Sequence, residues 1–255
     1  MSKLSEKDKF LDLSDYGRPL AKVFANSLKN TRFTAIHVTF LFGIVGLIAI
    51  YFILNESFIF AGIALVLKSI IDAADGELAR LKNNPSYIGR YLDSIFDILL
   101  NLLIFLAISY KTDSNLILTL LAFFCCQLQG TVYNFYYVIL RNRSLGGDKT
   151  SKIIERKTPK AIGDESQKIV NVLFVLYLVF YGVFDKIIQF LDQKAFSSSS
   201  FPKWFMTFVS IYGLGFQLLI ITLMLSLNLI DFIIPFFICY TFFVFILIGI
   251  RKSLL

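Results

Sequence analysis

Residues 36–54 read IHVTFLFGIVGLIAIYFIL and contain no Asp, Glu, Lys or Arg. A helix needs roughly 20 apolar residues to cross the hydrocarbon core of a bilayer. Lipid offers no partners to backbone N–H and C=O groups, so a spanning segment must pair them within a helix. This stretch therefore predicts a transmembrane α-helix.

Apolar runs of the same kind recur along the rest of the chain. The whole sequence is 56% hydrophobic and 17% charged, which is more apolar than a typical soluble domain. We therefore expect an all-α fold, a polytopic bundle of six to seven transmembrane helices. After residues 36–54, the candidate spans are residues 58–75, 91–109, 116–140, 169–190, 204–225 and 230–250.

Residues 1–35 are polar at their start and amphipathic further on. The start holds no apolar core and no small-residue cleavage site, so we expect no signal peptide. From residue 14 to residue 29, apolar residues recur at helical spacing with lysines among them, which is typical of a helix on a membrane surface. Ser14 or Asp15 could cap this helix, and Pro19 fits its first turn.

Lysine and arginine are concentrated in alternate loops. With a cytoplasmic N-terminus, residues 1–35, 76–90 and 141–168 face the cytoplasm and hold 18 of the 25 Lys and Arg residues, as the positive-inside rule requires. The formal net charge of +7 then fits loops beside an anionic membrane surface, and we expect no nucleic-acid partner. The side of the C-terminus stays open, because seven spans place Arg251 and Lys252 outside and six place them inside.

Acidic residues gather where the second span ends and the third begins. Residues 72–97 read DAADGELARLKNNPSYIGRYLDSIFD, with the turn-forming letters NNPS in the middle. Asp72 and Asp75 are three residues apart, and Asp93 and Asp97 are four apart, so each pair lies on one face of its helix. Because the turn lets the helices run antiparallel, the two aspartate pairs are expected to converge.

Four carboxylates at a membrane surface need a cationic partner, because like charges repel and ionisable groups at membrane depth are costly. All-oxygen ligands suit Mg²⁺, Mn²⁺ or Ca²⁺ better than zinc, and Mg²⁺ is a common handle for a diphosphate. Gly76 and Gly89 lack side chains, so a ligand can approach closely. The alternative, helix caps and interfacial charges without a metal, would explain one aspartate pair better than two pairs at fixed offsets.

The same residues match the pattern D-x2-D-G-x2-A-R-x8-G-x3-D-x3-D at every defined position. The pattern resembles the signature of the CDP-alcohol phosphotransferases, also called CDP-alcohol phosphatidyltransferases. The strict match covers residues 72–97, and a looser resemblance covers about residues 14–190. It implies a cytoplasmic N-terminal segment, residues 1–35, and a transmembrane catalytic domain, residues 36–255.

The resemblance implies a multi-pass membrane transferase of phospholipid biosynthesis, with its active site facing the cytoplasm. Such an enzyme moves a phosphatidyl-like group from a CDP-linked lipid, such as CDP-diacylglycerol, to a hydroxyl acceptor and releases CMP. Its partners would be these two substrates and membrane lipid, and relatives often form homodimers.

Each residue of the pattern has an implied role. The catalytic pair would be Asp93 and Asp97, with Asp97 as general base on the acceptor hydroxyl. Asp72, Asp75 and Asp93 would hold a two-metal centre of Mg²⁺ or Mn²⁺, to which Asp97 could contribute. The residues that leave room for the cytidine or bind the nucleotide diphosphate would be Gly76, Ala79, Arg80 and Gly89.

The acceptor alcohol stays undetermined. Residues 92–98 read LDSIFDI and lack the Pro and Lys that relatives using glycerol phosphate usually carry. Ile98 stands where inositol-phosphate relatives often have Arg. The segment also lacks the Phe-Gly-rich continuation of many serine-using relatives and the polar character of choline and ethanolamine relatives.

Other polar residues are weaker candidates. Thr39 lies in a segment similar to a P-N-x-x-T entry to the first span, but the Pro is missing. His37, the only histidine, reads as an interfacial residue. Arg141, Arg143 and Lys168 could bind a phosphate on the acceptor, although positive charge in a cytoplasmic loop is the favoured explanation.

Two other classes of membrane protein use acidic helices. Prenyltransferases also bind a diphosphate through Mg²⁺, but their Asp motifs lie far apart in the chain and they release diphosphate rather than CMP. Ion-coupled transporters place acidic residues near the middle of the bilayer in broken helices. Here both aspartate pairs fall within residues 72–97, at the ends of spans, which favours the phosphotransferase.

Overall fold

The computed structural model describes residues 4, 6–143, 155–198 and 201–254, and these form helices and turns without a strand. The all-α prediction is confirmed. The short 3-10 helices are η1 (Glu6–Asp8), η2 (Leu13–Asp15), η3 (Gln193–Ser197) and η4 (Ile230–Phe232). The α-helices are α1 (Arg18–Leu28), α2 (Ala35–Leu54), α3 (Phe58–Leu81), α4 (Tyr87–Lys111), α5 (Leu116–Arg143), α6 (Gln167–Leu191), α7 (Lys203–Ser210), α8 (Leu214–Ser226), α9 (Ile233–Tyr240) and α10 (Phe242–Leu254).

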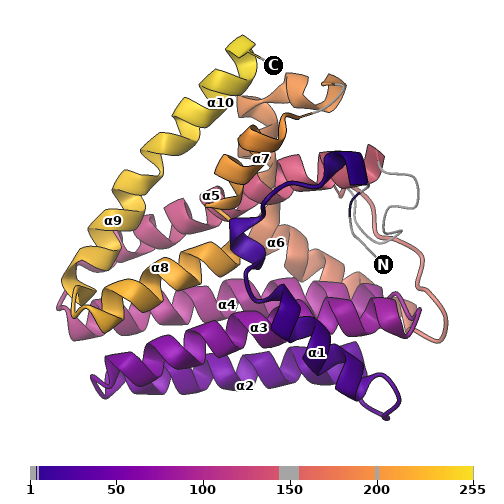
Figure 1. Ribbon diagram of the computed structural model, residues 1–255, viewed down its shortest axis with the longest axis horizontal. Helices are drawn as coiled ribbons and strands as arrows, with labels where there is room; N and C mark the ends of the chain where they lie inside the picture. The colour runs from indigo at the N-terminus through magenta and orange to yellow at the C-terminus, as the bar shows by residue number, and fades with distance from the viewer. Residues whose placement is uncertain (1–3, 5, 144–154, 199–200, 255) are drawn as a thin grey trace.

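The helices α2, α3 and α4 lie side by side and form the part of the bundle that carries the acidic motif (Figure 1). Tight turns join them, with positive φ at Glu56 and Asn83, so each helix folds back along the one before it. α3 continues to Leu81 and α4 begins at Tyr87, which is further than the predicted spans reach. The motif therefore lies almost wholly on helix, on both sides of one turn.

Small residues let α4 pack closely against α2. A Cβ atom added at Gly46 would lie 2.7 Å from Leu100 Cδ1, and one at Gly43 would lie 3.0 Å from Phe96 Cδ2. Helices in membranes associate mainly through such close backbone approach, because lipid is as apolar as the side chains.

In the described parts of the chain, five helical segments are long and apolar enough to cross a membrane, and the bent pair α7–α8 would make a sixth. The five are α2, α4, α5 up to Asn142, α6 and the segment Ile230–Ser253. α3 does not join them, because Lys68 and the charged motif occupy its second half, although it is 24 residues long and packs against α2 and α8. The chain is a multi-pass membrane protein, and the side of its C-terminus stays a prediction.

The predicted span 204–225 is not one straight helix. α7 and α8 meet at a bend of 48°. The N-terminal segment packs into this bend, where Leu13 N donates to Ser210 Oγ at 2.9 Å. A Cβ atom at Gly215 would lie 2.0 Å from Ser14 O, so only glycine allows this approach. Gly213 and Gly215 lie within the predicted span 204–225, but the apolar composition of that span does not by itself predict the bend.

The N-terminal helix begins later than the sequence predicts. Ser14 and Asp15 belong to η2, and α1 starts after Gly17, which has no capping side chain, so the predicted cap is wrong. α1 buries Ala21 and packs against α3. Leu20 and Val23 are exposed, and their contact with a membrane surface stays a prediction.

Candidate active site

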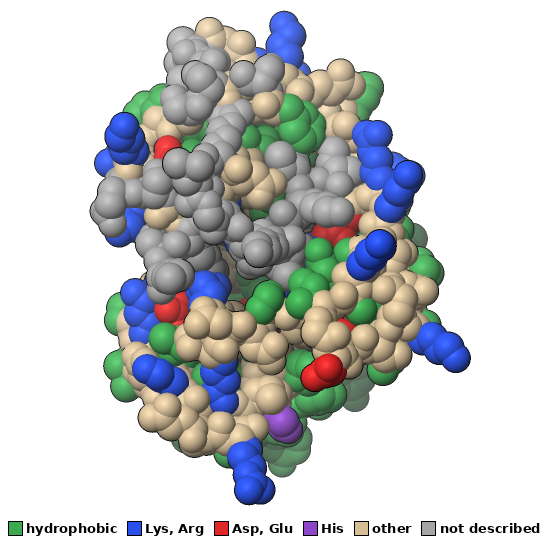
Figure 2. Space-filling view, turned by 90° about the vertical axis from the view of Figure 1, so that its right-hand side faces the viewer, with side chains coloured by type: hydrophobic (Ala, Val, Ile, Leu, Met, Phe, Trp, Pro, Cys, Tyr) green, Lys and Arg blue, Asp and Glu red, His purple; other side chains and the backbone are tan. Residues whose placement is uncertain are grey.

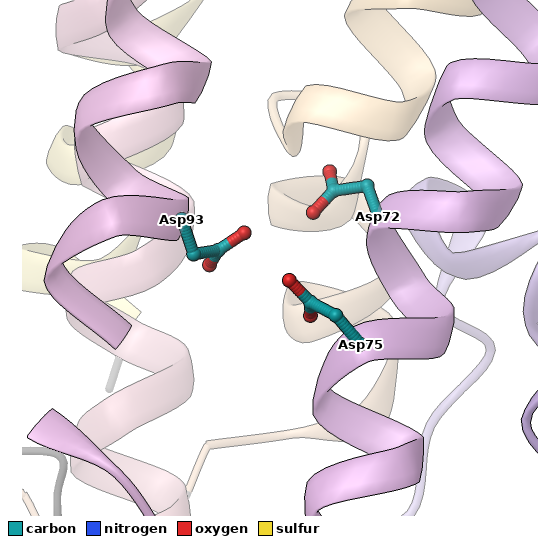
Figure 3. A group of neighbouring side chains, drawn as sticks. All are labelled: Asp72, Asp75 and Asp93. Carbon is teal, nitrogen blue, oxygen red and sulfur yellow. The ribbon is translucent and has the colours of Figure 1, made fainter. Parts of the chain in front are cut away.

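Three aspartates from two helices converge between α3 and α4. Asp72 and Asp75 project from α3, and Asp93 projects toward them from α4 (Figure 3). One carboxylate oxygen of each residue lies within 4.8 Å of the others. The two halves of the motif therefore meet in space, as the sequence predicts.

The start of α4 is fixed by caps from two parts of the chain. Ser86 Oγ accepts a hydrogen bond from Gly89 N at 2.8 Å. Glu165, which precedes α6, accepts from Tyr87 N at 3.2 Å and from Ile88 N at 2.9 Å. These bonds satisfy N–H groups that a helix start leaves without partners. They also set the position of the aspartates that follow on α4.

Asp75 is oriented by α2. Thr39 Oγ1 donates a hydrogen bond of 2.7 Å to Asp75 Oδ2, and both residues are buried. The structure thus gives Thr39 a carboxylate partner, while its contact with a nucleotide stays a prediction.

Asp97 is not part of the three-aspartate cluster, and a buried lysine binds it. Lys68 Nζ donates to Asp97 Oδ1 and also to Asp72 Oδ2, the latter at 3.3 Å. Lys68 is 0% exposed, and its ammonium lies 4.8 Å from the centroid of the Phe42 ring. Lys68 is not among the site residues predicted from the sequence. The available signal was a lysine inside an apolar run, four residues before an aspartate.

The residues expected to bind the nucleotide lie on the second half of α3. A Cβ atom at Gly76 would meet only the guanidinium of Arg80, with Nη1 at 3.4 Å, so this face is open. Ala79 beside it is partly exposed. Arg80 Nη2 donates to Glu77 Oε2 at 2.7 Å, whereas its Nε is buried without a hydrogen-bond partner. Arg18 of α1 lies 3.5 Å from the same Glu77 oxygen and so joins α1 to this face.

Gly89 has a packing role that the structure makes visible. A Cβ atom there would lie 3.2 Å from Ser86 Oγ and 3.6 Å from Ile36 Cγ1. Glycine therefore lets the start of α4 lie against the start of α2. Its expected role in making room for the cytidine stays a prediction.

The three-aspartate cluster fits a divalent cation. Its donors are all carboxylate oxygens, which suit Mg²⁺ and Mn²⁺. Asp93 Oδ1 is buried without a hydrogen-bond partner, an arrangement that costs free energy unless a cation or donor arrives. Within the described parts of the chain, this is the one group of three or more such ligands that could share an ion.

The secondary candidates have different surroundings. His37 Nδ1 accepts from Thr34 N at 3.0 Å, so this exposed histidine caps α2. Arg141 is buried and Lys168 is exposed, while the side chain of Arg143 lies outside the described residues. Their part in acceptor binding stays a prediction.

The end of the molecule where α3 meets α4 is rich in basic side chains. Figure 2 shows Lys and Arg side chains around much of the rim of this end, with a few acidic side chains among them. A rim of this kind suits a surface that receives phosphate-bearing ligands or faces anionic lipid.

These features define a multi-pass helical membrane protein with a carboxylate site for a divalent cation between two helices. The family model for CDP-alcohol phosphatidyltransferases matches residues 32–250. The chain therefore belongs to this family, whose members transfer a phosphatidyl group from a CDP-alcohol and whose centre depends on divalent metal. A comparison with curated proteins finds no significant match.

Proposed function

We propose that the protein transfers a phosphatidyl-like group from a CDP-linked lipid, such as CDP-diacylglycerol, to a hydroxyl acceptor and releases CMP at the cytoplasmic face of the membrane. The observation that carries the proposal is the convergence of Asp72, Asp75 and Asp93 between α3 and α4. Residues 1–35 form a cytoplasmic arm in this proposal, and residues 36–255 form the catalytic domain.

The donor diphosphate binds at the carboxylate cluster. Asp72, Asp75 and Asp93 hold Mg²⁺ or Mn²⁺, which neutralises charge on the diphosphate when it is bound. The family resemblance implies two ions. A second ion would need ligands besides these three carboxylates, and Asp97 is the remaining aspartate of the motif.

The nucleotide lies on the open face of α3. Gly76 and Ala79 leave room for the cytidine, with Gly89 at the facing helix start. Arg80 binds the nucleotide diphosphate, and its unpartnered Nε supports this role because it can donate a further hydrogen bond. The neighbouring Arg18 pairs with Asp15 and reaches Glu77, so it holds the start of α1 beside this face.

Asp97 acts as the general base. It follows Asp93 by one turn on α4, so base and metal ligand face the same reacting group. The carboxylate takes the proton of the acceptor hydroxyl, whose oxygen attacks the β-phosphorus. The bond from that phosphorus to the bridging oxygen breaks, and CMP leaves. Positioning of the two substrates supplies much of the rate enhancement.

The proposal is tested with purified protein in lipid nanodiscs, supplied with CDP-diacylglycerol and single acceptors: serine, glycerol phosphate, inositol phosphate, choline or ethanolamine. We expect CMP release with at least one acceptor. Chelation should stop the release, and Mg²⁺ or Mn²⁺ should restore it. Full activity after thorough chelation, or release of diphosphate in place of CMP, would contradict the proposed chemistry.

A further inference from the structure

Lys68 lies between two aspartates of the motif rather than at its edge. Its ammonium group donates to Asp97 on α4 and to Asp72 on its own helix. The side chain is fully buried, with the Phe42 ring beside the charge. A buried ammonium without partners would be strongly unfavourable, so these contacts hold it where it is.

The position of the ammonium bears on how many divalent ions can bind. One ion can share oxygens from Asp72, Asp75 and Asp93, which lie within 4.8 Å of one another. A second ion would need ligands besides these three carboxylates, and Asp97 is the remaining aspartate of the motif. The Lys68 ammonium already binds one oxygen of Asp97 and one oxygen of Asp72, and two cations placed side by side repel.

We propose that Lys68 supplies a built-in positive charge in place of a second divalent ion. The protein then binds one divalent ion, through Asp72, Asp75 and Asp93, and Asp97 stays outside its coordination shell. Lys68 is a positioning residue, since it acts through the carboxylates that it binds. The inference rests on the proposed function and departs from the two-metal centre that the family resemblance implies.

Four ionised carboxylates with one ammonium and one divalent ion leave one net negative charge, whereas a second divalent ion would leave one net positive charge. Phe42 of α2 adds a ring face that favours a monovalent organic cation at this point. Asp97 then keeps an oxygen that is bound neither by Lys68 nor by a metal, and this oxygen can take the proton of the acceptor hydroxyl.

The experiment counts Mn²⁺ ions bound per chain by electron paramagnetic resonance of free Mn²⁺, titrated into nanodisc-embedded protein without substrate. We expect one ion for the natural protein and one for Lys68→Arg, which keeps the charge. Lys68→Met should bind two. Lys29→Met, which removes an exposed lysine from the end of α1, is the control and should bind one.

Two ions in the natural protein, or one ion in a Lys68→Met variant that elutes and melts as a folded protein, would overturn the inference. If Lys68→Met does not fold, the Mn²⁺ affinity of the Asp97→Asn variant tests the inference instead. An unchanged Mn²⁺ affinity supports Lys68 as the partner of Asp97, whereas a loss of about tenfold or more identifies Asp97 as a ligand and overturns the inference. Two bound ions together with CMP release would contradict the inference but agree with the proposed function. No bound ion and no CMP release would contradict both the inference and the proposed function.

Discussion

The helices α2–α4 and the helices α7–α10 meet the demands of a membrane in different ways. α2, α3 and α4 are unbroken and have 20, 24 and 25 residues. α7 and α9 have only 8 residues each, and each is followed by a break. Side chains on unbroken helices keep a fixed register, which an array of metal ligands requires. The proposed chemistry therefore lies on the long helices, and the broken ones pack around them.

The breaks need polar partners, because a carbonyl released from a helix finds no water in lipid. At the break between α9 and α10, Gln129 Nε2 donates to Phe237 O at 3.0 Å and to Thr241 Oγ1 at 2.8 Å. Gln217 of α8 donates to Gln129 Oε1 at 3.0 Å and to Cys126 O at 2.9 Å. Buried glutamines thus join the broken helices to α5.

The largest expected effect is the loss of CMP release after a change at Asp93 of α4. It tests whether the catalytic residues lie only on the long helices. Asp93→Asn should lower CMP release by about 100-fold or more, because it weakens a charge-stabilising metal site. Chromatography and circular dichroism should show an inserted, helical protein. The control Asp231→Asn makes the same change at an exposed residue of η4 and should keep full activity. Turnover that survives Asp93→Asn would contradict the assigned role.

Two glycines of α3 sharpen the comparison. Gly76→Ala adds a methyl group to the open face, so we expect the KM for the CDP-linked donor to rise about tenfold while thermal stability stays unchanged. Gly62→Ala would place its Cβ 2.9 Å from Thr222 Cγ2 of α8. It should lower the free energy of unfolding by about 1–3 kcal/mol through overpacking, with an unchanged donor KM. An unchanged donor KM in Gly76→Ala, together with a raised donor KM in Gly62→Ala, would contradict the proposed position of the nucleotide on this face of α3.

A smaller effect is expected in the broken half. Gln217→Leu removes a donor from Cys126 O and from Gln129, and should destabilise the protein by about 1 kcal/mol, the usual scale for polar contacts between membrane helices. Melting followed by tryptophan fluorescence would measure this, since Trp204 lies on α7. Mn²⁺ binding should not change. A variant with normal stability but weakened Mn²⁺ binding would show that the two halves are coupled.

The smallest effect is expected at a turn of the long-helix half. The Lys111 ammonium beside Glu56 lowers the pKa of that exposed carboxyl below its ordinary value. Because the folded-state pKa is lowered, the pair stabilises the protein above the ordinary pKa, and this contribution is lost as pH falls through the lowered value. Exposed pairs are weak and screened by salt, so Glu56→Gln should leave the melting temperature unchanged near pH 7. A clear fall of the melting temperature of Glu56→Gln at neutral pH would show that this ion pair contributes substantially to the stability of the folded protein.

Local sequence patterns determined much of this protein. Apolar runs of membrane-spanning length predicted the helices, because each such segment must satisfy its own backbone in lipid. The spacing of Asp72, Asp75, Asp93 and Asp97 predicted two facing pairs, because residues three or four apart share a face of a helix. The same pattern identified the family.

Only the tertiary structure decided the partners that are distant in the chain. Lys68 and Asp97 are 29 positions apart, and Thr39 and Asp75 are 36 apart, so no helical periodicity connects them. The contact between Leu13 and Ser210 crosses 197 positions and shows the bend of α7–α8 as a packing site for the N-terminal segment. Packing brings such residues together, and packing depends on the whole chain. The sequence could therefore name the aspartates of the site but not the lysine that links Asp97 to Asp72.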